Sequence, residues 1–155
     1  MGEKLSVRVE DYLKSVYEVI ERKGYARIKD IAKDLSVKPS SVVEMMNKLQ
    51  TMDLVIYEKY GGVRLTEEGT VIAKVVRKRH ETFSKFLEII LVPREVALKD
   101  GHILEHQLDP KTILQFARFV EFMTDLSNKS GFIRRWAEEF KEYCSKEDKK
   151  ASEVS

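Results

Sequence analysis

Apolar residues recur at helical spacing along most of the chain, beginning with Leu13, Val16 and Ile20. Lys23-Gly24 ends this first segment, and Pro39 is placed to open a later helix at its first position. The pattern predicts helices over about residues 9–22, 28–35, 39–52, 67–91, 93–108, 110–126 and 131–144. Because the 155 residues include only three prolines and seven glycines, we predict a mainly α protein.

The periodicity changes from helical to alternating in one place. Residues 54–57 and 62–65 predict two short strands, joined by a turn with glycines at its tip. Three helices followed by a β-hairpin are the element order of a winged helix-turn-helix. We therefore predict an N-terminal winged helix-turn-helix over residues 1–72, an all-helical domain over 73–145 and a disordered tail over 146–155.

The predicted winged helix indicates a DNA-binding surface. In this fold the helix after the turn enters the major groove, and the helix before it crosses the DNA backbone. Asparagine can bind adenine edges, while serine and lysine suit phosphates or base edges. The residues expected to contact DNA are Arg27, Lys29, Lys38, Pro39, Ser40, Ser41, Glu44, Asn47, Lys48, Lys59 and Arg64. A winged helix that binds protein instead is the alternative at this point.

Composition and charge narrow the class of protein. The chain is 43% hydrophobic and 35% charged, and its apolar runs are too short to cross a membrane or to form a signal peptide. The single cysteine, Cys144, rules out an intramolecular disulfide, so a cytoplasmic protein is expected. Residues 1–80 hold 16 Lys and Arg against 12 Asp and Glu, whereas residues 81–155 hold 12 against 14. The basic first half is compatible with nucleic-acid binding.

All three histidines lie in the second half of the chain. His102, Glu105 and His106 form an H-x-x-E-H motif, and offsets of three and four residues place them on one face of a helix. Converging imidazole and carboxylate groups can hold a divalent cation. The alternatives are a solvated helix face for this pair of histidines and an ordinary surface position for His80. Inverted zinc peptidases share the motif, with Glu105 as general base, but that interpretation leaves the winged helix unexplained.

Four stretches of the chain carry a family resemblance: VEDYLKSVYEVIERKGYARIKDIAKDLSVKPSSV, LVIYEKYGGVRLTEEG, RKRHETFSKFLEII and HILEHQL. With them the chain, over about residues 7–126, resembles the diphtheria-toxin-repressor family of metal-dependent transcriptional regulators, most closely its manganese-transport-regulator branch. The resemblance implies a repressor of metal-ion uptake or homeostasis, with a helical dimerisation and metal-binding domain after the winged helix. The Src-homology-3-like third domain of longer members is not expected here.

The resemblance also implies a set of metal ligands. Asp11 matches a first-helix ligand that is aspartate in manganese-responsive members, and His80 matches the histidine of the long helix. Glu105 and His106 match the carboxylate–histidine pair that members share, and His102 stands where manganese members carry glutamate. The expected ligands are Asp11, His80, His102, Glu105 and His106.

The chain departs from the family pattern on its first helix. Lys14 stands where the manganese branch has a second glutamate ligand, and an ammonium group cannot coordinate a cation. Ser84 and Leu98 stand where iron-responsive members place further ligands. We therefore expect one main metal site per subunit.

The remaining predictions concern the metal ion and the partners of the chain. Imidazoles and carboxylates accept most first-row divalent metals, so Zn(II) and Co(II) are expected to bind in vitro. The family resemblance implies Mn(II) or Fe(II) as the metal of the site, with Mn(II) first because of the manganese branch. Operator DNA and a second copy of the chain are the expected partners. The homodimer is expected to form through Ile113, Leu114, Phe116, Ala117, Phe119, Val120, Phe122 and Met123. A purely intramolecular core is the alternative for these residues, and a metal-independent winged-helix regulator is the alternative for the function.

Overall fold

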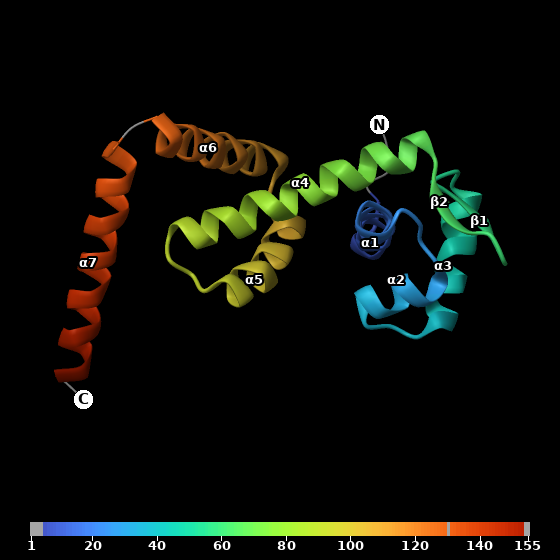
Figure 1. Cartoon of the computed structure of the whole chain (residues 1–155), viewed down its shortest axis with the longest axis horizontal. Coiled ribbons are helices and arrows are strands. Elements are labelled where there is room, and N and C mark those ends of the chain that lie inside the picture. Colours follow the sequence, from blue (N-terminus) through green and yellow to red (C-terminus); the bar gives the residue numbers. More distant parts are fainter. Residues whose placement is uncertain (1–4, 130, 154–155) are drawn as a thin grey trace. The chain divides into compact units, whose positions relative to one another are not determined.

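The computed structural model describes residues 5–129 and 131–153 (Figure 1). Over these residues the chain forms seven helices and one two-stranded antiparallel sheet. It divides into two compact units, Met1–Lys78 and Arg79–Ser155, and the division falls inside helix α4 (Glu67–Ile89). The predicted fold class, a winged helix-turn-helix followed by helices, is confirmed.

The first helix, α1 (Val7–Lys23), has clear signals at both ends. The Ser6 hydroxyl accepts a hydrogen bond from the Val9 N–H at 3.3 Å, so the helix begins two residues before its predicted start. Gly24 ends it in the left-handed conformation, with φ of 80°, and donates its N–H to the Ile20 carbonyl. Glycine adopts this conformation without steric cost.

Helices α2 (Ile28–Leu35) and α3 (Pro39–Thr51) form the helix-turn-helix. Ser36 turns the chain between them with φ of 54°, and the Val37 N–H bonds to the Ala32 carbonyl at 3.0 Å. At the start of α2, the Lys23 ammonium donates a hydrogen bond of 2.6 Å to Asp30 and lowers the pKa of that carboxyl. This pair ties the end of α1 to α2.

The three helices enclose the core of the first unit. Seven of their apolar side chains have no exposed surface at all: Leu13, Val16, Val19, Ile31, Val42, Met46 and Leu49. Burying a side chain of this size contributes about 1.5–3 kcal/mol relative to leaving it exposed. Since the buried residues of α3 occupy one side of that helix, its polar residues are left on the other side.

Strands β1 (Val55–Glu58) and β2 (Gly62–Leu65) form the wing, with Val55 opposite Leu65 and Glu58 opposite Gly62. The first strand therefore begins one residue later than predicted. The Val63 N–H also donates to the Ala26 carbonyl at 2.9 Å, which attaches the hairpin to the segment between α1 and α2.

Gly62 is required by this attachment. Its φ is 93°, and a Cβ here would lie 2.7 Å from the Ala26 carbonyl oxygen. We expect Gly62→Ala to lower the free energy of unfolding by about 2–4 kcal/mol, because strain and a backbone clash add together. Gly24→Ala is the control, since its φ is also positive but no atom lies near the added methyl group; it should cost about 1 kcal/mol. Equal losses in urea unfolding would show that the Ala26 contact relaxes freely.

The start of α4 is bonded to the first unit. The Thr66 hydroxyl donates to the Asp53 carbonyl at 2.8 Å and accepts the Gly69 N–H at 3.1 Å. The Thr66 N–H donates to the Leu54 carbonyl, and Gly69 lies so close to that carbonyl group that a side chain would not fit. The first turn of α4 is thus held by the chain segment that leads into the wing.

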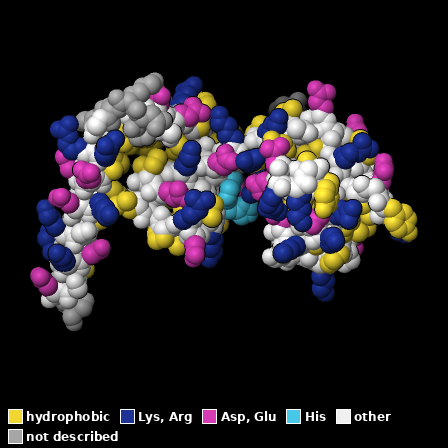
Figure 2. Space-filling model, in the orientation of Figure 1, with side chains coloured by type: hydrophobic (Ala, Val, Ile, Leu, Met, Phe, Trp, Pro, Cys, Tyr) yellow, Lys and Arg dark blue, Asp and Glu magenta, His cyan; other side chains and the backbone are white. Residues whose placement is uncertain are grey.

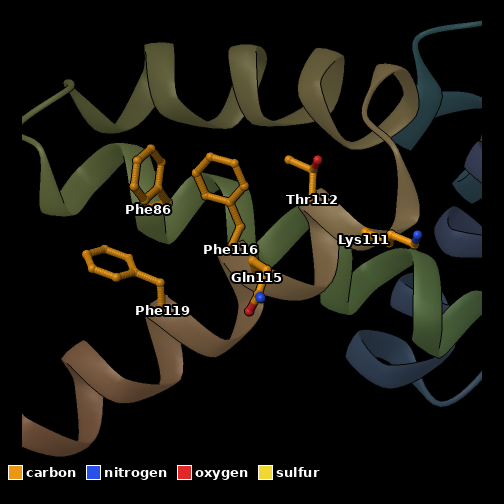
Figure 3. A pocket seen from close by; sticks show the side chains of 6 residues that line it. All are labelled: Phe86, Lys111, Thr112, Gln115, Phe116 and Phe119. Carbon is orange, nitrogen blue, oxygen red and sulfur yellow. The ribbon is translucent and has the colours of Figure 1, made fainter.

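The second unit contains the rest of α4, α5 (Arg94–Gln107), α6 (Pro110–Lys129) and α7 (Gly131–Glu153). Helix α4 ends at Ile89, not at the predicted Leu91, because Leu91 adopts a left-handed φ of 67°. Phe83 is fully buried and lies 5.4 Å from Phe116, between ring centroids. Phe86, Phe116 and Phe119 line an apolar groove of about 480 Å³ between α4 and α6, with Lys111, Thr112 and Gln115 (Figure 3).

The predicted disordered tail, residues 146–155, differs from the structure. Helix α7 continues through Glu153, and residues 154–155 lie outside the described residues. A Lys150–Glu147 ion pair of 2.7 Å and a Ser152 hydroxyl bonded to the Asp148 carbonyl stabilise this part. The high charge that suggested disorder is also compatible with a solvated helix. No helix in the described part of the chain combines the length and apolar character needed to span a bilayer.

Candidate metal centre and nucleic-acid interface

Three imidazoles surround one buried carboxylate in the second unit. Glu105 is 1% exposed, and its Oε1 lies 2.9 Å from His102 Nδ1 and 3.1 Å from His106 Nε2. Its Oε2 lies 3.7 Å from His80 Nδ1. Histidine side chains are visible as a cyan patch on the surface in Figure 2. Helix α5 thus supplies the whole H-x-x-E-H motif, and α4 adds His80.

A close approach of α4 and α5 makes this cluster possible. Gly101 is buried on α5, and a Cβ there would lie 2.8 Å from Ser84 Oγ and 3.0 Å from Ser84 N on α4. His80 is one turn before Ser84, and His102 directly follows Gly101. A larger residue at 101 would force the two helices apart at the point where their imidazoles meet. No local sequence pattern indicates this glycine, because its role depends on a contact between helices.

The donor set fits a first-row divalent metal. Three neutral imidazoles and a carboxylate are borderline ligands, and His80, His102 and His106 can each offer a ring nitrogen. For His102, Glu105 and His106, one ligand atom of each lies within 4.8 Å of the others. Such spacing allows all three to bind the same ion.

The fifth predicted ligand is Asp11, and Lys14, Ser84 and Leu98 are the positions where the chain departs from the family pattern. Asp11 lies on α1 of the first unit and is half-buried, as is Lys14 one turn later. In the second unit Ser84 is buried, whereas Leu98 is 41% exposed. Neither Ser84 nor Leu98 has the donor chemistry of a carboxylate or an imidazole.

The predicted DNA-contacting residues of α3 lie opposite its buried side. Ser40, Glu44, Asn47 and Lys48 are exposed, and Ser41 is half-buried. Lys38 and Pro39 are exposed where the helix begins, with Pro39 in its first turn. The free N–H groups of that turn give the helix start a partial positive charge, which favours phosphate.

Cationic side chains flank α3 on both sides in the sequence. The Arg27 guanidinium lies over the Tyr25 ring at 5.1 Å, and Lys29 is exposed on α2. On the wing, the Lys59 ammonium lies 5.7 Å from the centre of the Tyr60 ring, and Arg64 pairs with Glu58 at 3.4 Å. Neither the contact of Lys59 with Tyr60 nor the pairing of Arg64 with Glu58 was predicted from the sequence.

A winged helix-turn-helix joined to a helical unit with this imidazole–carboxylate cluster defines a metal-dependent DNA-binding transcriptional regulator. Residues 4–63 match the family described as iron dependent repressor, N-terminal DNA binding domain, and residues 66–128 match its metal binding and dimerisation domain. The chain belongs to this iron-dependent repressor family, as its resemblance to the diphtheria-toxin-repressor group predicted.

Individual relatives agree with this assignment. The HTH-type transcriptional regulator MntR of Bacillus pumilus is 42% identical over 122 residues, 79% of this chain and 85% of that protein. MntR of Bacillus subtilis is 42% identical over 76% of this chain and 82% of its own length. The solved structure of the manganese regulator SloR is 30% identical with a TM-score of 0.64, covering 74% of this chain and 54% of SloR.

Membership decides between the functional alternatives. The family consists of metal-dependent regulators that bind DNA and dimerise, so both the zinc-peptidase and the metal-independent interpretations are wrong. The structure agrees with the first of these conclusions, because the side chain of Glu105 has no exposed surface from which to act as a general base on a substrate.

Proposed function

We propose that the chain represses genes for metal-ion uptake or homeostasis when Mn(II) or Fe(II) is abundant. The observation that carries this proposal is the Glu105 carboxylate, buried beside three imidazoles in a chain whose other unit is a DNA-binding fold. The similarity to MntR and to the manganese regulator SloR supports Mn(II) as the first choice. The MntR relatives come from Bacillus species, whose DNA lies in the cytoplasm, and this supports a cytoplasmic location.

The proposed ligands are Asp11, His80, His102, Glu105 and His106. The carboxylate and imidazole donors around Glu105 support four of them, and the family resemblance supports Asp11. When bound, the cation supplies positive charge and fixed bonding directions that hold these side chains together. Lys14, with its ammonium group, favours one such centre per subunit.

We propose that residues 1–72 bind operator DNA, with α3 in the major groove. Asn47 is placed for adenine edges, and Glu44 can accept a hydrogen bond from cytosine. The other contacts are proposed to be with phosphates or with nearby base edges, from Arg27, Lys29, Lys38, Pro39, Ser40, Ser41, Lys48, Lys59 and Arg64. Their exposure or half-exposure on and around α3 and the wing supports this set.

We propose that residues 73–145 form the homodimer. The match of residues 66–128 to a dimerisation domain supports this, as does the apolar groove of Phe86, Phe116 and Phe119. Leu114 and Phe122 lie on α6, as Phe116 and Phe119 do, and are 50% and 60% exposed. Contact with a second copy of the chain would remove this apolar surface from water.

Metal and DNA binding are coupled in this proposal. A dimer places two copies of α3 on half-sites about 34 Å apart. Asp11 belongs to the unit that reads DNA and the other ligands belong to the unit that dimerises, so a shared metal centre restricts the spacing of the reading helices. The coupling is reciprocal, so operator DNA tightens metal binding by the same factor.

The testing experiment titrates metal-free dimer with Mn(II), Fe(II) and Zn(II) under anaerobic conditions at fixed salt. Anisotropy of a labelled DNA fragment from upstream of the chain's own gene reports binding. We expect one metal to raise the affinity by about 5- to 150-fold. Tight binding that neither metal nor chelator changes would contradict the proposed switch.

A further inference from the structure

The wing carries three charged side chains whose arrangement was not predicted. Glu58 ends β1, Lys59 follows it, and Arg64 lies on β2. The Arg64 guanidinium donates to the Glu58 carboxylate at 3.4 Å, and both side chains are largely exposed. Of the two cations on the wing, one is therefore paired within the wing.

Gly61 leaves the space in which Glu58 makes this pair. A Cβ at position 61 would strike the Glu58 carboxylate and lie 3.0 Å from the Glu58 Cβ. The carboxylate thus folds back over the turn instead of extending away from it. The Glu58 carboxylate can therefore occupy this position only because residue 61 has no side chain.

The tip of the wing presents a different surface. Tyr60 is 95% exposed, and the Lys59 ammonium lies 5.7 Å from the centre of its ring. An aromatic ring this exposed gains nothing from the core, whereas a phenol hydroxyl and an ammonium group both donate hydrogen bonds to phosphate.

We propose that Glu58 competes with DNA phosphates for Arg64, which weakens the Arg64 contact proposed above, so that the wing contacts DNA mainly through Lys59 and Tyr60 at its tip. The inference rests on the wing–DNA contact proposed above. An exposed ion pair contributes at most about 1 kcal/mol to stability, but its carboxylate also repels nearby phosphates. The wing therefore approaches DNA with a net charge of +1 from Glu58, Lys59 and Arg64.

The competition makes DNA binding depend more on metal. Phosphate contacts are independent of sequence and require no metal, so each additional free cation raises the affinity of the metal-free protein for any DNA. By pairing with Arg64, Glu58 keeps the affinity of the metal-free protein for non-operator DNA low. The wing then contributes mainly when α3 is bound at an operator.

The test compares Glu58→Gln, Lys59→Gln, Arg64→Gln, Tyr60→Ala and the double variant Glu58→Gln/Arg64→Gln as full-length protein. The probe is a labelled duplex of random sequence, titrated with and without Mn(II) over a range of salt concentrations. Glu139→Gln is the control, because it removes an exposed negative charge from α7. Thermal melting confirms that each variant is folded.

We expect Glu58→Gln to tighten binding roughly 5-fold and to steepen the dependence of log affinity on log salt by about one. Lys59→Gln should weaken binding roughly 5-fold, and Tyr60→Ala roughly 3-fold. Arg64→Gln should weaken binding less in the unchanged protein, where Glu58 already holds the guanidinium, than in the Glu58→Gln background, where it should cancel the whole gain. Glu139→Gln should leave affinity unchanged.

Two other outcomes would contradict different parts of the proposal. If Arg64→Gln weakens binding by the same factor with and without Glu58→Gln, Glu58 does not compete for Arg64, and the competition is overturned while the wing contact stands. If no wing variant changes affinity or its salt dependence, the wing does not contact DNA, and both the proposed contact and this inference fail.

Discussion

Glu105→Gln abolishes the metal response of DNA binding. The substitution preserves side-chain volume but removes the carboxylate charge that three imidazoles surround. Changing even a residue that supports a ligand costs 10- to 100-fold in metal affinity, so we expect a loss of at least about 100-fold here. Isothermal titration of metal-free protein with Mn(II) measures the affinity, and anisotropy of labelled operator DNA measures the response.

Glu95→Gln is the matched control, because Glu95 is exposed in the first turn of the same helix. It should keep both the metal affinity and the response of the unchanged protein. His106→Ala should reproduce the loss seen for Glu105→Gln with the fold intact, as far-UV circular dichroism can establish. If Glu105→Gln instead kept a full metal response, the cluster would have a purely structural role.

Phe119→Glu dissociates the dimer. Phe119 is 41% exposed, lies 6.0 Å from Phe86 between ring centroids, and lines the groove in Figure 3. A carboxylate buried there without a partner loses its hydration, so the dissociation constant of the dimer should rise at least about 100-fold. Sedimentation velocity measures this change. Operator affinity should fall with it, because a monomer carries one reading helix instead of two.

Arg118→Gln is the control for the charge change, since Arg118 is exposed on the same helix and both substitutions lower the net charge by one. It should leave the dimer intact. The alternative that the phenylalanines form only an intramolecular core makes a different prediction. In that case Phe119→Glu would lower the melting temperature without changing the dimer at any temperature below melting.

Most helices could be predicted from the sequence, because the residues that start, end and pattern a helix lie within or beside that helix. The bounds of α2 are those predicted, and α3 differs only at its last residue, since apolar spacing and Pro39 act within one helix. The largest difference is at the end of α7, where charge suggested disorder. There, ion pairs between neighbouring turns support a helix that has little apolar surface of its own.

The candidate site was predictable only in part. The H-x-x-E-H spacing places His102, Glu105 and His106 together because they share one helix. His80 comes from another helix, and its approach depends on the contact of Gly101 with Ser84, which no local pattern indicates. The pairing of Glu58 with Arg64 was missed for the same reason, because it depends on how the hairpin turns.

The hydrogen bonds around Thr66 determine where the first unit, which binds DNA, can be cut and joined to another protein. Asp53 and Leu54 bind Thr66 through their carbonyl groups, and Gly69 packs against Leu54 in the first turn of α4. A chimera joined at the end of β2 would lose these contacts and expose the carbonyl groups to water. A functional fusion of the DNA-binding unit to another effector domain must therefore include the first turn of α4. A fusion point later in α4 should leave the DNA-binding unit able to fold.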